Sequence, residues 1–280
     1  MNQLQLQEVS IEVFIEKYAK NGETTLDQNR RRVAKALASV ENENVRADYE
    51  ERFYRALDNG FIPAGRISSA AGTNIQATLI NCFVQPIGDA MRGMAKDGRP
   101  SIMKALEEAA ETLRRGGGVG YNFSHLRPCG GFVSATNSRS SGPVSFMRVF
   151  DKTCETVESA GARRGAQMGV LNCDHPDIEE FIHAKDTGDL KNFNISIAVT
   201  DAFMEAVEKD ADYQLIHVAE PHPEVIAELG AFQREDGMWV YRTVKARTLW
   251  DQVMQSTYDH AEPGILYIDR MNQENNLYYC

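Results

Sequence analysis

The sequence predicts an α/β protein in which a helical N-terminal subdomain, residues 1–60, precedes a mixed α/β body, residues 61–280. Two patterns predict this arrangement. Apolar residues recur at helical spacing in the first part, whereas strand-like and helix-like patterns alternate in the second. No repeat of fixed period interrupts either part. With 280 residues and a hydrophobic fraction of 42%, the chain can bury a substantial core.

Helical periodicity defines the N-terminal subdomain. Its apolar positions are Ile11, Phe14, Ile15 and Tyr18, then Val33, Ala36, Leu37 and Val40, and finally Tyr49, Phe53 and Leu57. The Asn-Gly pair at 21–22 separates the first two groups, and the Asn-Gly pair at 59–60 ends the pattern. Such pairs favour turns, so we expect consecutive helices joined by short loops.

Strands and helices are expected to alternate through the α/β body. In its first half we expect a buried strand at 79–84 stopped by Pro86, a helix from the N-cap Ser101 to the glycines at 116–118, a strand at 119–123, a long loop at 126–143 and a helix at 146–157. In its second half we expect strands at 167–171, 195–199, 213–218 and 265–268, helices at 176–182, 200–207 and 249–258, and a charged segment at 220–236. Alternation of side chains predicts that the strand at 195–199 is half-buried.

The charge balance argues against a general nucleic-acid-binding surface. Thirty Lys and Arg residues stand against forty Asp and Glu residues, which leaves a net charge of −10, whereas neutralising phosphates needs a cationic face. The N-terminus lacks the basic and apolar regions of a signal peptide, and no window approaches 18 uninterrupted apolar residues. We therefore expect a cytoplasmic protein that neither enters a membrane nor binds nucleic acid.

Cysteine and histidine spacing does not predict a metal site. The five cysteines are scattered, odd in number and without a CxxC pair, so neither a zinc site nor a disulfide framework is indicated. The six histidines form no paired ligand spacing, and His175 and His183 are expected at helix surfaces. By composition alone, Cys82 is a small buried hydrophobic residue.

Glycines at 116, 117, 118 and 120 form the densest glycine cluster of the body. The cluster follows a predicted helix rather than a strand and lacks a downstream Lys-Ser or Lys-Thr, so neither the dinucleotide fingerprint nor the P-loop fits. A helix stop explains one of these glycines. A surface where a ligand approaches bare backbone remains an equally open interpretation of the others.

Two loops place arginines among small residues. Arg163 and Arg164 lie in the glycine-rich loop 159–166, and Arg127 begins the long loop at 126–143. Each arginine can be a solvated residue or can meet a phosphate or a base edge. Together, in an acidic chain, they indicate a local anion site for a nucleotide. Asp89 can be a solvated turn residue or a ribose ligand.

Five segments, taken in order, resemble the amino-terminal half of a ribonucleotide reductase catalytic subunit. They are residues 71–73 with 79–83 (AGT and LINCF), 116–128 (GGGVGYNFSHLRP), 141–151 (SGPVSFMRVFD), 163–169 (RRGAQMG) and 174–182 (DHPDIEEFI). The resemblance extends from about Gly60 to Cys280. The glycine, Ser-Gly-Pro and Arg-Arg-Gly-Ala segments are most similar to class II, the adenosylcobalamin-dependent branch.

The resemblance implies a fold and a substrate site. The family's catalytic domain is a ten-stranded α/β barrel, of which residues 61–280 would form the first half. Cys82 matches the cysteine that delivers reducing equivalents and ends in a disulfide with a second, downstream cysteine. Removing a ribose 2′-hydroxyl as water requires two electrons, which a dithiol supplies. Asn81 and Cys82, with Gly117 and Gly118, match positions that line the substrate ribose.

The resemblance also implies an allosteric site. Asp89 and Arg127 match the specificity-effector site, where a deoxynucleoside triphosphate binds at a dimer interface. Arg163, Arg164 and Gln167 match the loop that connects the effector to the substrate base. Such coupling requires the effector to favour one loop conformation, and a loop rich in Gly and Ala can adopt several.

The resemblance further implies cofactors and partners: adenosylcobalamin as the radical source, a homodimer of the assembled enzyme, and a thioredoxin-like or glutaredoxin-like reductant. The family's Asn-x-Cys-x-Glu catalytic loop does not occur in this sequence, and the residues ending at Cys280 resemble the stretch just before it. We therefore expect a complementary C-terminal half to carry that loop, and this chain to be inactive alone. Two alternatives stay open: a class I large-subunit fragment that needs a metal-containing radical subunit, and a non-catalytic nucleotide-binding or assembly module.

Overall fold

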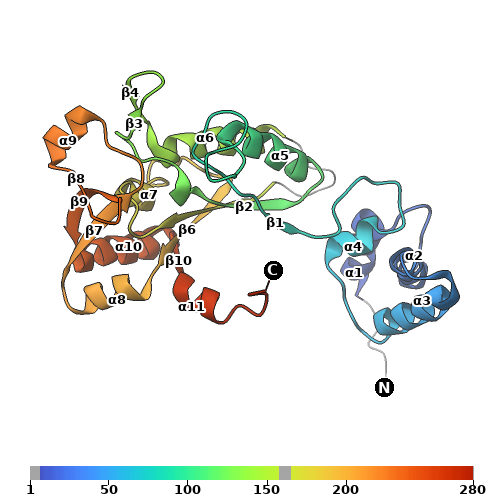
Figure 1. Cartoon of the computed structure of the whole chain (residues 1–280). Coiled ribbons are helices and arrows are strands. Elements are labelled where there is room, and N and C mark those ends of the chain that lie inside the picture. Colours follow the sequence, from blue (N-terminus) through green and yellow to red (C-terminus); the bar gives the residue numbers. More distant parts are fainter. Residues whose placement is uncertain (1–6, 158–164, 280) are drawn as a thin grey trace. The chain divides into compact units, whose positions relative to one another are not determined.

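The computed structural model describes residues 7–157 and 165–279 (Figure 1). These residues form two compact units, which are described separately. The helical unit contains residues 7–82 and 114–117, and the α/β unit contains residues 83–113, 118–157 and 165–279. The helical unit thus extends beyond residue 60, the boundary expected from the sequence, because the helix that follows this boundary packs against the preceding helices.

The helical unit consists of short helices, as its apolar periodicity predicts. They are α1 (Glu8–Val13), η1 (Phe14–Tyr18), α2 (Leu26–Ala38), α3 (Glu43–Asp58) and α4 (Gly65–Ala70). A capping box begins α2: the Thr25 side chain accepts from the Gln28 backbone, and the Gln28 side chain accepts from the Thr25 backbone. Val33, Ala34 and Leu57 form the buried core between α2 and α3.

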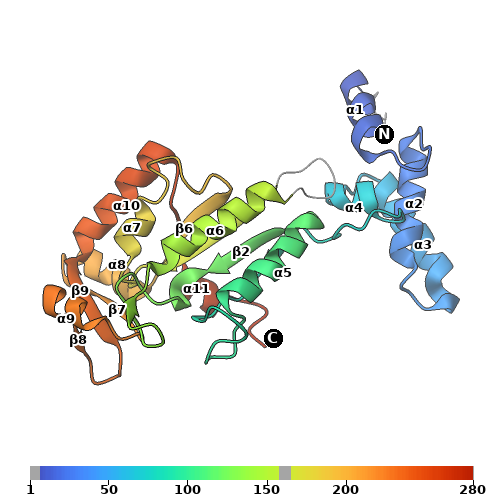
Figure 2. The same cartoon turned by 90° about the horizontal axis from the view of Figure 1, so that it is seen from above.

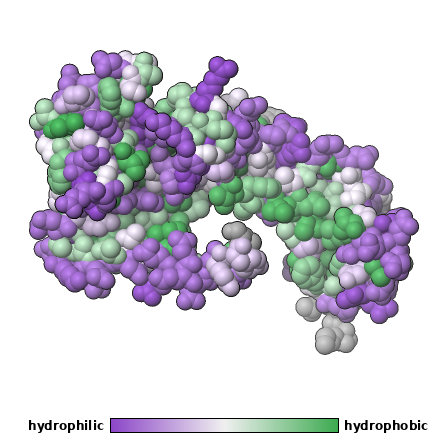
Figure 3. All heavy atoms as spheres, viewed as in Figure 1, coloured by the Kyte–Doolittle hydropathy of each residue, from purple (hydrophilic) through white to green (hydrophobic). Residues whose placement is uncertain are grey.

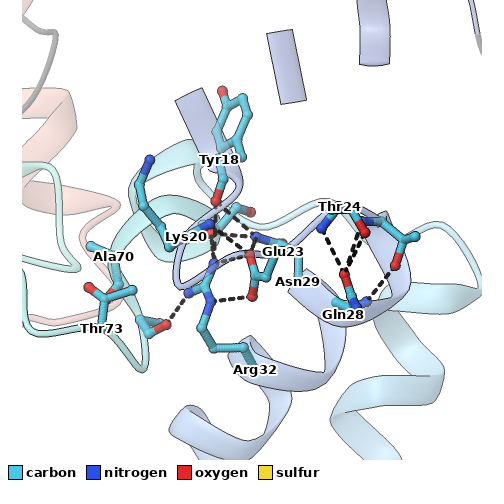
Figure 4. A network of polar contacts seen from close by, with 12 residues as sticks. Tyr18, Lys20, Glu23, Thr24, Gln28, Asn29, Arg32, Ala70 and Thr73 are labelled. Carbon is cyan, nitrogen blue, oxygen red and sulfur yellow. Dashed lines mark hydrogen bonds and ion pairs between the residues drawn. The ribbon is translucent and has the colours of Figure 1, made fainter. Parts of the chain in front are cut away.

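A buried polar network joins α2 to α4 (Figure 4). Arg32 on α2 donates from Nε to Glu23 at 2.6 Å and from its Nη atoms to the carbonyl oxygens of Ser68, at 2.9 Å, and Ala71. Asn29 donates to the same Ser68 carbonyl at 3.0 Å. Because the side chains of Arg32 and Glu23 are only 10% and 8% exposed, little water competes for these bonds. The network therefore fixes the chain at residues 68–71 on α2.

Apolar side chains remain on the surface of the helical unit (Figure 3). The exposed large hydrophobic residues of this unit include Val9, Ile11, Ile15, Phe61, Ile62 and Ile80. Exposed apolar surface of this kind marks sites that pack against further polypeptide.

A five-stranded sheet organises the α/β unit. Its strands, in spatial order, are β1 (Cys82–Val84), β2 (Gly118–Asn122), β5 (Gln167–Asn172), β6 (Phe193–Val199) and β10 (Gly264–Tyr267). From β2 to β10, each neighbouring pair is parallel. Helices cover both faces, with α5 (Ile102–Arg114) and α6 (Gly142–Thr156) on one and α8 (Asp201–Glu208) and α10 (Ala246–His260) on the other (Figures 1 and 2). The predicted order, a helical N-terminal part followed by an α/β part, is confirmed.

Smaller elements complete this unit. They are η2 (Phe123–His125), α7 (Ile178–Ile182), α9 (Pro223–Leu229), α11 (Ile268–Gln273), the hairpin β3 (Phe132–Val133) and β4 (Ser138–Arg139), and a second sheet in the order β7 (Asp212–His217), β9 (Trp239–Lys245), β8 (Phe232–Gln233). The second sheet is antiparallel. The loop expected at 126–143 therefore contains a short hairpin, and β9 is a strand that the sequence pattern did not reveal.

Two expectations about strand burial are wrong. The segment at 79–84 is not a buried strand, since Cys82 is exposed and Val84 is 88% exposed. The reason is position, because β1 is the last strand at one end of the sheet order. Conversely, β6 is buried at six of its seven residues rather than half-buried, because it lies inside a parallel sheet covered on both faces.

Aromatic packing stabilises the centre of the α/β unit. Tyr121 and Phe123 from β2 and η2 meet Phe150 of α6 and Phe193 of β6, and the Tyr121 and Phe150 ring centroids lie 4.9 Å apart. All four residues are at most 2% exposed.

None of the helices in the described ranges has both the length and the apolar composition needed to cross a bilayer.

Candidate functional site

A cavity of about 670 Å³ lies within the α/β unit, at the carboxyl ends of β2 and β5. Polar and titratable side chains line much of its wall, among them Asp89, Ser124, His125, Arg127, Asn172 and His217. The end of strand β7 and the residues after it, 216–220, also line the cavity. Ligands of open α/β sheets bind at the carboxyl ends of the strands, so the position and the lining both suit a ligand.

Asp89 and Arg127, which the family resemblance assigns to the effector site, lie together in this cavity. The Arg127 Nε atom donates to both Asp89 carboxylate oxygens, at 3.1 and 2.9 Å, and the Arg127 backbone N–H donates to Oδ1 at 3.2 Å. A second guanidinium nitrogen donates to the Phe132 carbonyl oxygen at 2.6 Å. Both side chains are nearly 30% exposed, so the pair faces the cavity instead of being sealed in the core.

Two buried histidines also line the cavity, and sequence reasoning missed both. The rings of His175 and His217 lie 5.4 Å apart, edge to face. Burial lowers the pKa of His175 to about 3 and that of His217 to about 4, so both rings are neutral near pH 7. The expectation that His175 lies at a helix surface is wrong, since the residue is 2% exposed in the turn after β5. His183 is exposed, as expected.

The predicted substrate residues divide between the two units. Asn81, Cys82 and Gly117 belong to the helical unit, and Gly118 opens β2 in the α/β unit. Cys82 is exposed. Among the described residues, two buried side-chain oxygens have no hydrogen-bond partner, and both, Thr78 Oγ1 and Asn81 Oδ1, lie within four residues of Cys82. That these residues line one ribose pocket stays a prediction.

The first glycine of the cluster at 116–120 has a local explanation within the helical unit. Gly116 has φ +85°, and the Arg66 guanidinium lies 1.9 Å from where a Cβ would stand. The Arg66 Nη1 atom and the Thr78 backbone N–H both donate to the Arg115 carbonyl oxygen, each at 3.1 Å. Gly117 and Gly118 are not among the residues with positive φ. A helix stop therefore explains only Gly116, as the sequence suggested.

The structure describes only one of the three residues expected in the loop between effector and substrate, Gln167. Arg163 and Arg164 lie outside the described residues. Gln167 is the first residue of β5 and is 3% exposed, and its amide donates to the Phe150 carbonyl oxygen at 3.1 Å and accepts from the Tyr121 hydroxyl at 2.9 Å. Gln167 thus packs in the core, and its contact with an effector stays a prediction.

The cysteines of the α/β unit differ in their surroundings. Burial raises the pKa of Cys154 and of Cys173 to about 11 each, which keeps both as inert thiols near neutral pH. Within the described ranges, no three His, Cys, Asp or Glu side chains gather as they would around a metal ion.

Comparisons with known proteins identify the family of both parts of the chain. Residues 4–76 match the family model described as "Ribonucleotide reductase, all-alpha domain". Residues 80–280 match the model described as "Ribonucleotide reductase, barrel domain". The two models follow one another in the order in which the helical and the α/β unit follow one another.

Individual relatives are similar over most of this chain. A vitamin B12-dependent ribonucleoside-diphosphate reductase of Thermoplasma acidophilum is 36% identical over 230 residues, which cover 81% of this chain and 27% of that protein. A reductase of the same description from Mycobacterium tuberculosis is 36% identical over 253 residues, 89% of this chain and 33% of that protein. A ribonucleoside-diphosphate reductase large subunit of Caenorhabditis elegans is 30% identical over 219 residues, 73% of this chain and 28% of that protein. The chain thus spans a third of these relatives or less.

Proposed function

The chain belongs to the ribonucleotide reductase large-subunit family, and on that premise we propose that it forms the amino-terminal portion of an adenosylcobalamin-dependent ribonucleotide reductase. The observation that carries the proposal is the ordered match of both family models over nearly the whole chain. The choice of the cobalamin-dependent branch follows the relatives at 36% identity, whose names state that dependence. The activity itself requires the Asn-x-Cys-x-Glu loop on further polypeptide.

The proposed reaction converts a ribonucleotide to a 2′-deoxyribonucleotide. The C2′–OH bond breaks, the hydroxyl leaves as water, and a C2′–H bond forms. Two thiols supply the two electrons and two protons and become a disulfide, which a thioredoxin-like or glutaredoxin-like dithiol reduces afterwards. We assign one of these thiols to Cys82 and the other to the polypeptide that follows in the relatives.

Three features around Cys82 support this assignment. Its thiol is exposed, so a substrate and a reductant can both reach it. Asn81 Oδ1 and Thr78 Oγ1 are buried without a partner, which destabilises the protein unless a donor such as a sugar hydroxyl or a water arrives. The strand β1 lies at the end of the sheet order, where further strands can be added.

Adenosylcobalamin is the proposed cofactor of the assembled enzyme. Adenosylcobalamin, when bound, supplies the radical that starts the reaction. We assign none of the described residues to the corrin, so the steps proposed for this chain are binding, orientation and electron supply.

The cavity at Asp89 and Arg127 is the proposed effector site. Arg127 offers a guanidinium to the phosphates of a deoxynucleoside triphosphate, and Asp89 offers a carboxylate to its sugar hydroxyl. Arg163 and Arg164 of the connecting loop are proposed to carry the signal to the substrate base, and the assembled enzyme is proposed to be a homodimer.

A cofactor dependence assay tests the proposed class. The chain, completed by polypeptide with the Asn-x-Cys-x-Glu loop, is incubated with each ribonucleoside diphosphate and triphosphate and a dithiol. We expect deoxyribonucleotide only when adenosylcobalamin is added. Product that instead requires a metal-containing radical subunit would assign the chain to class I, and absence of product with either addition would favour a binding or assembly module.

A further inference from the structure

Asp177 stands at the N-cap of α7 but does not cap that helix. No N–H of the first turn donates to its side chain. Instead the carboxylate turns away and accepts the backbone N–H of Cys129 at 2.8 Å. The residue is 7% exposed, and burial raises its pKa to about 7. A buried carboxylate destabilises the protein unless it accepts hydrogen bonds, and Asp177 makes none with the first turn of α7. The bond from the Cys129 N–H is therefore its compensating contact.

The chain closes around this carboxylate from a second side. A Cβ at Gly142 would lie 2.5 Å from Asp177 Oδ2 and 2.9 Å from the Cys129 nitrogen, so no larger residue fits there without movement. Gly142 also has φ +81°. Cys129 and Gly142 are the two ends of the hairpin segment 129–142, which contains β3 and β4. Asp177 therefore contacts the segment at its base, where the two ends meet.

The same turn also holds the other side of Arg127. The Asp177 backbone N–H donates to His175 Nδ1 at 3.1 Å, which leaves Nε2 to donate to the Leu126 carbonyl oxygen at 3.1 Å. Leu126 precedes Arg127, and Cys129 follows it by two residues. The turn at 175–177 thus holds the backbone on both sides of the arginine that lines the cavity.

The course of the backbone between Leu126 and Cys129 sets the position from which the Arg127 side chain extends. Its side chain reaches Asp89 and the Phe132 carbonyl oxygen only if the backbone between Leu126 and Cys129 keeps its course. Placing a charged donor to within a fraction of an ångström of an anion depends on such support from surrounding residues. No residue of the turn needs to touch the ligand for this effect.

We propose that Asp177 is a positioning residue for the ligand cavity: its contact with the Cys129 N–H, together with the His175 contact to Leu126, holds Arg127 in the orientation that receives the triphosphate of the effector. This inference rests on the proposed function in one respect, the identification of the cavity as the effector site. The contact itself does not depend on that identification.

The test compares two substitutions in the full chain. Asp177→Asn keeps an oxygen that can accept from Cys129. Asp177→Ser introduces a good N-cap residue for α7, but the serine side chain is too short to reach Cys129. This variant therefore separates helix capping from the contact with Cys129. Asp189→Ser, in the exposed pair with Arg148, is the matched control.

Two measurements are made on each variant. Equilibrium binding of dATP, dTTP, dGTP and dCTP, each alone, reports on the cavity. Amide hydrogen exchange of residues 126–142 reports on the hairpin segment. We expect Asp177→Ser to speed exchange across 126–142 and to weaken binding of the preferred triphosphate about tenfold, a loss of the size of one hydrogen bond's net contribution. Asp177→Asn should stay within about threefold of the natural chain, and Asp189→Ser should change neither readout.

Contrary results separate the two claims. Faster exchange with unchanged triphosphate binding would overturn the positioning role, as would unchanged exchange. If the natural chain binds no triphosphate, the effector assignment fails, whereas faster exchange in Asp177→Ser would still support the contact. If Asp177→Ser does not fold, Gly142→Ala applies the same test by pushing a methyl group against the carboxylate, and it is expected to speed exchange at 126–142.

Discussion

The Asp89 carboxylate is held by Arg127 from two directions, by the guanidinium at 2.9 Å and by the backbone N–H at 3.2 Å. These residues are 38 positions apart in the sequence, and the α/β unit brings them together at the carboxyl end of β2. The contact keeps the guanidinium in one orientation while leaving part of it open to the cavity. A prearranged cation of this kind loses little side-chain entropy when an anion binds.

Arg127→Lys should weaken triphosphate binding. Lysine keeps the charge but loses the planar fork that meets Asp89 and the Phe132 carbonyl oxygen together. We expect a loss of about tenfold to a hundredfold in affinity, since hydrogen bonds to charged groups contribute roughly 1.5–3 kcal/mol. Equilibrium binding of deoxynucleoside triphosphates measures the effect. Arg270→Lys, in the exposed pair with Asp201, is the control, and equal affinity in both variants would argue against the site.

Thiol reactivity should divide the four described cysteines into two classes. Cys82 and Cys129 are exposed, whereas Cys154 and Cys173 are buried with a pKa raised to about 11. Burial also raises the pKa of Cys129. At pH 8 we therefore expect iodoacetamide to modify Cys82 at least about tenfold faster than the buried pair, and Cys129 more slowly than Cys82, because the thiolate is the nucleophile and needs access to solvent. Peptide mass spectrometry over time gives the rates. A Cys82 that reacts only after denaturation would contradict its proposed exchange with a reductant.

The buried histidines should make stability depend on pH below neutrality. In the unfolded chain each imidazole binds a proton below about pH 6.5. In the folded chain His217 does so only near pH 4, because burial lowers its pKa. Lowering the pH from 6.5 to 5 should therefore reduce the free energy of unfolding by about 2 kcal/mol for a histidine with this shift. His217→Asn should flatten the urea-measured slope in this range, and the exposed His183→Asn should not. An unchanged slope in His217→Asn would show that the ring already titrates normally.

Asp177 should act in the opposite direction. Burial raises its pKa to about 7, so the folded chain keeps a proton that the unfolded chain has lost above about pH 4. The contribution of Asp177 to the free energy of unfolding is largest at low pH and is lost as the pH rises through 7. The asparagine of Asp177→Asn stays neutral. The unfolding free energy of this variant, relative to that of the natural chain, should therefore increase from pH 4 to 8. The charged or titratable groups around the carboxyl are Cys129, His175, Glu180, Tyr241 and Arg242. A constant difference across this range would mean that Asp177 is ionised in the folded state.

Removing one partner of the Arg32 and Glu23 pair should destabilise the helical unit. Arg32→Met leaves a buried carboxylate unpaired and takes donors from the carbonyl oxygens of Ser68 and Ala71. We expect a loss of about 3–5 kcal/mol by urea denaturation, and a smaller loss in Arg32→Met/Glu23→Gln, which has no unpaired charge. The exposed Arg55→Met, in the pair with Glu51, should leave the midpoint nearly unchanged. A double variant less stable than Arg32→Met alone would contradict this account.

The sequence predicted most elements but not how exposed they are. Helical and strand spacing located α2, α5, α10 and β6, since each carries a full period of apolar residues. Periodicity cannot tell an edge strand from a central one, so β1 was expected to be buried. The strand β9 was not predicted, because Arg242 and Lys245 interrupt its apolar pattern and a turn precedes it.

The candidate site was predictable only where a motif carried it. Asp89 and Arg127 were identified through the family resemblance, and the structure brings them together. Asp177 lies in the family-like segment 174–182 and His217 lies in none of the five segments, but neither was singled out, because their partners lie on other elements that only the fold brings near. A buried histidine and a surface histidine look alike in sequence, which is why His175 was misplaced.

The most direct test of the central claim is a single turnover without external reductant. The completed enzyme is reduced, freed of dithiol, and given ribonucleotide and adenosylcobalamin, and both deoxyribonucleotide and the oxidation state of Cys82 are measured. We predict that each deoxyribonucleotide formed is matched by one disulfide that contains Cys82, and that Cys82→Ser forms no deoxyribonucleotide. A natural-chain yield from Cys82→Ser, or product formed while Cys82 stays reduced, would contradict the assignment.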